Sequence, residues 1–294
     1  MSLPHCRAVS AIATALMLGW SAQSVAGPSI GQFEVKNLES TPGEIEFQSQ
    51  NAHMFGQPGR RVAEGDDETL YDDNSIARQR HALELEFGIT PRLKSRVGME
   101  YEKERVDDPV DPSRRNDFDG LRLSEVGAEV IFVIDPIEED DDWGLGVVAE
   151  YERPTGGREA SSLLLGTIVQ ARQGPWWGNV NLYLVRPLGG DRPRDGKLDF
   201  AYASQFGAEI DDHWRVALEA YGTVDRLGNT GRRDEAAERF GDHDQHRAGP
   251  LLYYATEVGG DEDGVEVLLG AGVLAGLNRN TPAVTLKWTV EVAF

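Results

Sequence analysis

Apolar and polar residues alternate along the last ten positions of the chain, TLKWTVEVAF at 285–294, where every second residue is apolar and the others are polar or small. A period of two predicts a β-strand with two unlike faces. Chain ends normally fray into solvent, so an apolar face that reaches Phe294 must be held by another part of the structure.

The same alternation recurs in stretches of about ten residues after Gly27, with turn signals between them. Two clear examples are HALELEFGI at 81–89 and RLKSRVGMEYE at 92–102. The pattern predicts twelve strands, at 43–53, 80–89, 92–103, 121–134, 143–153, 161–172, 176–186, 197–209, 213–224, 245–257, 264–276 and 283–294.

The links between these strands alternate in length. Short links lie at 90–91, 174–175, 210–212 and 259–263, and the long, charged ones lie at 55–77, 105–120, 187–196 and 225–244. Short and long links therefore belong to opposite ends of the sheet. An even number of strands places both termini at the end with the short turns.

The N-terminus has the features of a secretory signal peptide. Arg7 precedes an apolar run at 8–20, and the small residues Ser24 and Ala26 precede a cleavage position. The run is shorter than the roughly 20 residues of a spanning helix, which disfavours a membrane anchor. We expect a cleaved signal peptide at 1–26, a periplasmic N-terminal segment at 27–42 and a β-barrel at 43–294.

Composition narrows the partners. The formal net charge is −21, which disfavours nucleic acid as a partner. The only cysteine, Cys6, lies in the signal peptide, so the mature chain has no disulfide and no cysteine-based metal site. An exported chain of this length without disulfides needs a large regular framework.

Together these features predict an all-β protein, a transmembrane antiparallel up-and-down β-barrel of about twelve strands in the outer membrane of a Gram-negative bacterium. A soluble barrel also alternates, but its polar residues face outward, and the faces opposite the apolar ones are here too charged to fill a dry core. We expect an aromatic girdle near the strand ends, formed by Trp143, Trp176, Trp177, Trp214, Tyr101, Tyr151, Tyr221 and Tyr254.

The C-terminal VTLKWTVEVAF, which ends on Phe294, resembles the signal by which outer-membrane barrels are recognised for insertion. HRAGPLLYYATE at 246–257, the Gly-rich stretch 264–276 and LNRNTPAVTLKW are similar to the C-terminal half of the outer-membrane family named for the MetA pathway of phenol degradation. That resemblance implies a transporter of small solutes. It implies no established substrate and no site residues.

The polar faces predict the wall of the lumen. Its residues are Glu84, Glu86, Lys94, Arg96, Glu100, Glu102, Glu129, Glu150, Glu152, Arg215, Glu219, Glu266, Lys287 and Glu291, with Glu44, Glu46, Glu125, Asp199, Glu209 and Arg247 on the same faces. We expect Glu86 opposite Lys94 and Glu84 opposite Arg96, with Glu100, Glu102, Glu150 and Glu152 unpaired. Twelve strands predict a narrow or partly obstructed pore, and its acidic wall favours cations and neutral solutes.

The sequence therefore predicts a channel for passive diffusion of small polar, aromatic or cationic solutes, without cofactor or metal. A wall that only keeps the interior wet fits the same charges. The rivals are a structural or surface-interaction barrel that acts through its outer loops and a lipid-modifying enzyme, for which no suitable His–Ser spacing exists.

Four polar segments are further candidates for binding ligands. The segment Asp242, His243, Asp244 and His246 carries groups that bind divalent ions, but an ordinary polar loop explains it better. The acidic run 138–142 lacks the spacing of a calcium loop. Arg114-Arg115 and Arg232-Arg233 are candidates to contact lipopolysaccharide. We expect the barrel assembly machinery to be a further partner, through Phe294.

Overall fold

The computed structural model describes residues 33–56, 62–64, 69–71, 78–103, 105–106, 113, 117–137, 143–156, 160–189, 198–224, 227, 244–259 and 264–294. The expected signal peptide, the acidic run 138–142, the two Arg-Arg pairs, Asp242 and His243 lie outside these residues.

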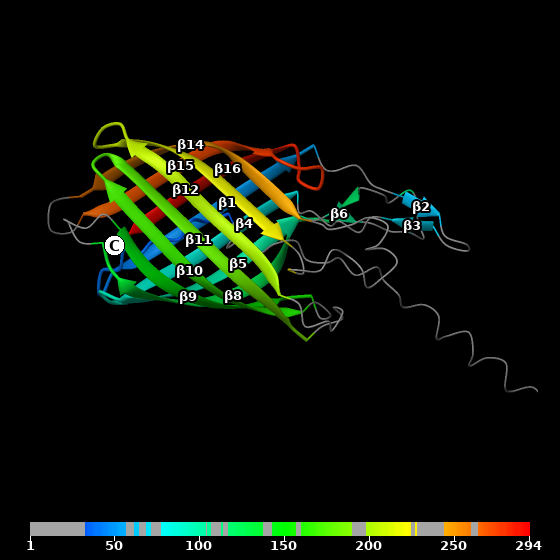
Figure 1. The fold of residues 1–294 in the computed structure, drawn as a ribbon, viewed down its shortest axis with the longest axis horizontal. Helices are drawn as coiled ribbons and strands as arrows, with labels where there is room; N and C mark the ends of the chain where they lie inside the picture. Colours follow the sequence, from blue (N-terminus) through cyan, green and yellow to red (C-terminus); the bar gives the residue numbers. More distant parts are fainter. Residues whose placement is uncertain are drawn as a thin grey trace, which may run out of the picture.

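Twelve antiparallel strands close into one barrel (Figure 1), in the order β1-β16-β15-β14-β13-β12-β11-β10-β9-β8-β5-β4. Their bounds are β1 Ile45–Phe55, β4 Gln79–Thr90, β5 Leu93–Lys103, β8 Arg122–Asp135, β9 Trp143–Pro154, β10 Ser161–Gln173, β11 Trp176–Leu188, β12 Asp199–Glu209, β13 Trp214–Val224, β14 Gln245–Val258, β15 Val265–Gly276 and β16 Val284–Ala293. All twelve predicted strands are confirmed, with ends shifted by two residues or fewer.

Two short hairpins were not predicted. They pair β2 (Val62–Glu64) with β3 (Thr69–Tyr71), and β6 (Arg105–Val106) with β7 (Asp117–Phe118). Both fall in predicted long links, and in Figure 1 β2 and β3 lie beyond the end of the barrel opposite the C-terminus. Among the described residues, no helix is long and apolar enough to cross a bilayer.

The barrel closes between β1 and β16, from Glu46 opposite Ala293 to Phe55 opposite Val284. The main chains of Ile45 and Phe294 then exchange two hydrogen bonds, of 2.9 and 3.3 Å. The last strand is therefore paired along both edges, with β15 on its other side. The pairing with β1 therefore explains what holds the apolar C-terminal end of the chain in place.

The two faces of the sheet differ as predicted. Leucine, valine and phenylalanine side chains such as Leu85, Val97 and Leu218 are exposed on the outside, and charged side chains such as Glu84, Arg96 and Glu219 are buried inside. Trp143, Trp176, Trp214 and Tyr151 are exposed on the outside, as a girdle requires. Tyr221 does not belong to it: this side chain is buried in the lumen, on the same inward face as Glu219. Trp177 does not belong to it either, because its side chain packs against the inward apolar residues.

The predicted register between β4 and β5 is wrong by two residues. Glu86 lies opposite Arg96, and Lys94 lies opposite Gly88. The tight turn contains Pro91 and Arg92 rather than Thr90 and Pro91, and an irregularity between Gly88 and Thr90 shifts the ladder again. Proline favours the second position of such turns, where its fixed φ angle fits.

Candidate functional site

A stretch of chain ahead of β1 lies inside the barrel. We call residues 33–42 the internal segment. Lys36 is 1% exposed, and its backbone N–H donates to Oδ1 of Asn181 at 2.7 Å. The Leu38 N–H donates to Gln170 Oε1 at 2.9 Å. We expected 27–42 to be periplasmic, whereas these contacts place residues 33–38 within the lumen.

Glycines of the wall make room for the internal segment. A Cβ atom added to Gly144 or Gly146 of β9 would lie 3.0 or 2.5 Å from a methyl carbon of Leu38. One added to Gly88 of β4 would lie 1.9 Å from the carbonyl oxygen of Thr41. Glycine inside a strand commonly marks the close approach of another backbone. The wall is therefore shaped to accept this segment.

Ion pairs fasten the segment to the wall. Lys36 pairs with Glu129 and lies 3.7 Å from Glu150, and Glu34 pairs with Arg96. Burial alone would raise the pKa of Glu34, but the charges of Arg96 and Lys36 outweigh it and lower this pKa to about 2. Both partners of each pair are buried, so removing Lys36 or Glu34 would take away part of the charge that compensates its partner.

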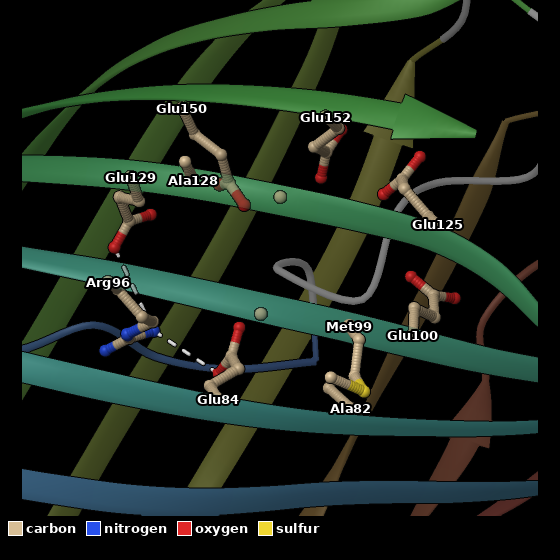
Figure 2. Close-up of a pocket in the computed structure, with 12 residues that line it drawn as sticks. Ala82, Glu84, Arg96, Met99, Glu100, Glu125, Ala128, Glu129, Glu150 and Glu152 are labelled. Carbon is tan, nitrogen blue, oxygen red and sulfur yellow. Dashed lines mark hydrogen bonds and ion pairs between the residues drawn. The ribbon is translucent and has the colours of Figure 1, made fainter. Parts of the chain in front are cut away.

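An acidic cavity remains beside the internal segment. The space in it that a water molecule can enter is about 30 Å³, room for roughly two waters, and it opens to solvent. Figure 2 shows carboxylates directed into this space from neighbouring strands, with Arg96 at one side. The acidic residues of its lining are Glu84, Glu100, Glu125, Glu129, Glu150 and Glu152.

The charged wall is paired more fully than the sequence predicted. Arg96 lies 2.6 Å from Glu86 and 3.5 Å from Glu84, and Lys94 lies 2.9 Å from Glu86. The predicted partners of Glu84 and Glu86 are therefore met diagonally, despite the shifted register. This works because long side chains reach across to the next position of the ladder.

The four glutamates expected to be unpaired are not a uniform set. Glu100 and Glu102 both pair with Arg80 of β4, which the sequence analysis did not place in the lumen. The carboxylate of Glu152 accepts a short hydrogen bond from the Ser162 hydroxyl group. The unpaired expectation is wrong for Glu100 and Glu102, because Arg80 alternates onto the same inward face of β4. It is also wrong for Glu150, because Lys36 of the internal segment pairs with it.

A second charged cluster lies on β13, β14 and β16. Glu219 is fully buried and accepts hydrogen bonds from Lys287 at 2.7 Å and from the hydroxyl groups of Tyr221 and Tyr253. Gln205 of β12 donates to Glu219 at 2.7 Å as well. This cluster cross-links four strands through the interior, so these groups stiffen the wall.

Part of the lumen is apolar, which the sequence analysis did not predict. Inward side chains of β8 to β15 pack together and against Leu38 of the internal segment. The largest of them are Ile131, Val133, Leu164, Ile168, Tyr183, Leu251 and Leu274. These positions interrupt the polar alternation of their strands. The internal segment thus has an apolar side as well as charged contacts.

The predicted lumen residues occupy inward-facing positions. Arg215, Glu266 and Glu291 lie near the short-turn end, where Glu266 is exposed and the other two are half-buried. The remaining ones are buried: Glu84, Glu86, Lys94, Arg96, Glu100, Glu102, Glu129, Glu150, Glu152, Glu219 and Lys287. Sequence reasoning missed Glu34, Lys36 and Arg80.

Within the described part of the chain, no group of three or more His, Cys, Asp or Glu residues could hold a metal ion. His246 of the predicted polar segment stacks on Tyr202 and lies 3.2 Å from its hydroxyl group.

No protein-family model matches the sequence, and no curated protein matches it. Solved structures do resemble the fold. An outer membrane channel from Pseudomonas putida F1 aligns over 91% of this chain and all of that one, at 12% identity and a TM-score of 0.51. The NanC porin aligns over 84% of this chain and 98% of that one, at 10% identity and a TM-score of 0.46. The KdgM porin aligns over 85% of this chain and 98% of that one, at 7% identity and a TM-score of 0.43. The first likeness shows a shared barrel fold.

Proposed function

We propose that this protein is an outer-membrane channel that passes small solutes by diffusion through the acidic side of its lumen. Its fold is shared with a known outer membrane channel, and its exposed outer face is apolar. The observation that carries the proposal is the acidic cavity left beside the internal segment. A lumen filled only by packed side chains would leave no such space.

The charge of the cavity sets the solutes it favours. Among the described residues, six glutamates and one basic residue, Arg96, line it, so cations and neutral solutes enter at a lower electrostatic cost than anions. The internal segment narrows the path, which limits passage to small molecules. The proposal includes export with a cleaved signal peptide, insertion through recognition of Phe294, and contact with lipopolysaccharide.

Liposome swelling with matched neutral, cationic and anionic solutes tests this function. We expect Glu152→Gln to reduce the advantage of a cation over a matched anion by roughly fivefold or more, because one unit charge at about 4 Å in water contributes about 1 kcal/mol. Glu266→Gln is the control, because Glu266 is exposed and outside the cavity lining. No swelling with any solute would contradict the channel; equal permeation of all charge classes would contradict the selectivity.

A further inference from the structure

The internal segment places an aromatic ring in a charged part of the lumen. Phe33 is buried, and its ring lies 4.7 Å from the guanidinium carbon of Arg247 on β14. The guanidinium of Arg80 lies 6.0 Å from the same ring, and the Tyr221 ring lies 5.7 Å away. The Phe33 site is therefore bounded by two cations and an aromatic ring, with Ala52 and Met54 packed beside it.

Arg247 differs from the other buried cations of the lumen. Its guanidinium donates to Thr285 Oγ1 at 3.0 Å and to Gln245 Oε1 at 2.8 Å, both neutral acceptors. Lys36, Lys94, Arg80, Arg96 and Lys287 each pair with a carboxylate, whereas no carboxylate of the described residues pairs with Arg247. A buried cation without an anionic partner is costly, so it favours an incoming anion.

We propose that the Phe33 site binds small aromatic carboxylates, with the ring of the solute in the place of Phe33 and its carboxylate on Arg247. An arginine fork matches a carboxylate with two parallel hydrogen bonds. Its planar face also attracts an aromatic ring. Phe33 supplies only a ring, whereas the solute supplies both a ring and a carboxylate that pairs with Arg247. Withdrawal of Phe33 opens the site.

This inference rests on the proposed channel function, because a solute that crosses the lumen is the natural occupant of the site. It adds a specific binding site for one class of anion within a lumen whose wall is mostly acidic. The Phe33 site and the acidic cavity are separate: none of Phe33, Tyr221 and Arg247 lines that cavity. The two can be tested independently.

Binding of benzoate to the full-length protein in detergent micelles tests the site without transport. We expect Phe33→Ala to tighten benzoate binding roughly tenfold, because the competing ring is removed. Adding Arg247→Gln to this variant should weaken binding roughly tenfold or more, because the charged hydrogen bonds are lost. Arg172→Gln is the matched control, since Arg172 pairs with Glu209 at an exposed position.

Two further ligands separate charge from aromaticity. Cyclohexanecarboxylate keeps the charge without the π face, and benzylamine keeps the ring with the opposite charge. Both should bind at least several-fold more weakly than benzoate. Equal binding of benzoate and cyclohexanecarboxylate, or benzoate binding that survives Arg247→Gln, would overturn the proposal. So would an absence of benzoate binding by Phe33→Ala.

If Arg247→Gln does not assemble, Arg247→Lys decides the matter. It keeps the charge but loses the planar fork, so benzoate should bind several-fold more weakly in the Phe33→Ala background; unchanged binding would overturn the proposal. Heat-modifiable mobility in gels checks barrel assembly. Failure of liposome swelling with retained benzoate binding would remove the channel function and leave the site in place.

Discussion

The side-chain amide of Asn181 holds both polar backbone groups of Lys36. The Lys36 N–H donates to Asn181 Oδ1 at 2.7 Å, and Asn181 Nδ2 donates to the Lys36 carbonyl oxygen at 3.0 Å. Asn181 is fully buried on β11. One side chain of the wall thus acts on the internal segment as the edge of a neighbouring strand would.

Asn181→Ala should loosen the internal segment. Two buried backbone groups would lose their partners, at a cost of about 1–3 kcal/mol each unless water replaces them. We expect a higher single-channel conductance in planar bilayers, because the segment spends more time displaced. Asn179→Ala is the matched control, since Asn179 lies on the same face of β11 and its side-chain oxygen accepts no hydrogen bond from the described part of the segment. Equal conductance of wild type and Asn181→Ala would contradict the role of this contact.

Gly146→Ala should displace the segment by a steric route. The added Cβ would lie 2.5 Å from Leu38 Cδ2, so the leucine has to move. Overpacking of this kind costs about 1–3 kcal/mol. We expect increased conductance, and Leu38→Ala in the same chain should relieve the clash while leaving the segment otherwise fastened.

Gly178→Ala on the outward face of β11 provides the control for this substitution. The nearest atoms to a Cβ at Gly178 lie at 3.6 Å, an ordinary contact, and Gly178 does not line the cavity, so no change in conductance is expected. Equal conductance of Gly146→Ala and Gly178→Ala would contradict the role of Gly146 in making room for Leu38.

The strands were predictable because the period-two alternation of apolar and polar residues can be recognised within each stretch of about ten residues, without knowledge of the partner strands. The internal segment was not, because FEVKNL at 33–38 alternates as well and nothing local says where its faces pack. Gly144 and Gly146 were the available signal, since glycines inside a strand mark close approach.

Arg80 shows a different limit of the sequence. It is the first residue of the predicted strand at 80–89 and directly precedes the clear alternation at 81–89, so it was not counted among the inward-facing residues. The predicted β4–β5 register was also wrong because the information that determines it is not in the strand itself. Alternation fixes which face a residue occupies, whereas the turn fixes its partner, and the irregularity after Gly88 has no local signature.

Acid should release the internal segment. The pKa of Glu34 in place is about 2, below its ordinary value of 4.5, because Arg96 and Lys36 outweigh burial. The depressed pKa means that Glu34 stabilises the docked segment fully above about pH 4.5 and loses this effect as the pH falls toward 2. We therefore expect conductance to rise below pH 4.5.

Glu34→Gln isolates this effect from the other carboxylates around Arg96, which are Glu84, Glu86 and Glu129. The variant should conduct more than wild type at pH 7, and the difference should shrink as the pH falls. A difference that stays constant from pH 7 to pH 3 would contradict the assignment to Glu34.

Leu165→Arg distinguishes a barrel in lipid from one in water. Leu165 lies near the middle of β10 and is 54% exposed on the outer face. An arginine at the bilayer midplane of a barrel costs about 2–4 kcal/mol, falling to about 0–1 kcal/mol near the interfaces. Ile210→Arg is the matched control, because Ile210 is 62% exposed in the short link between β12 and β13.

Denaturant unfolding from lipid vesicles measures both substitutions. In lipid, we expect Leu165→Arg to lower the free energy of unfolding by about 2–4 kcal/mol and Ile210→Arg by less than about 1 kcal/mol. In water, both exposed positions would tolerate arginine within about 0.5 kcal/mol. Equal, small effects at the two positions would therefore mean that the apolar outer face does not contact acyl chains. Because a channel must span a membrane, this result would also contradict the proposed channel function.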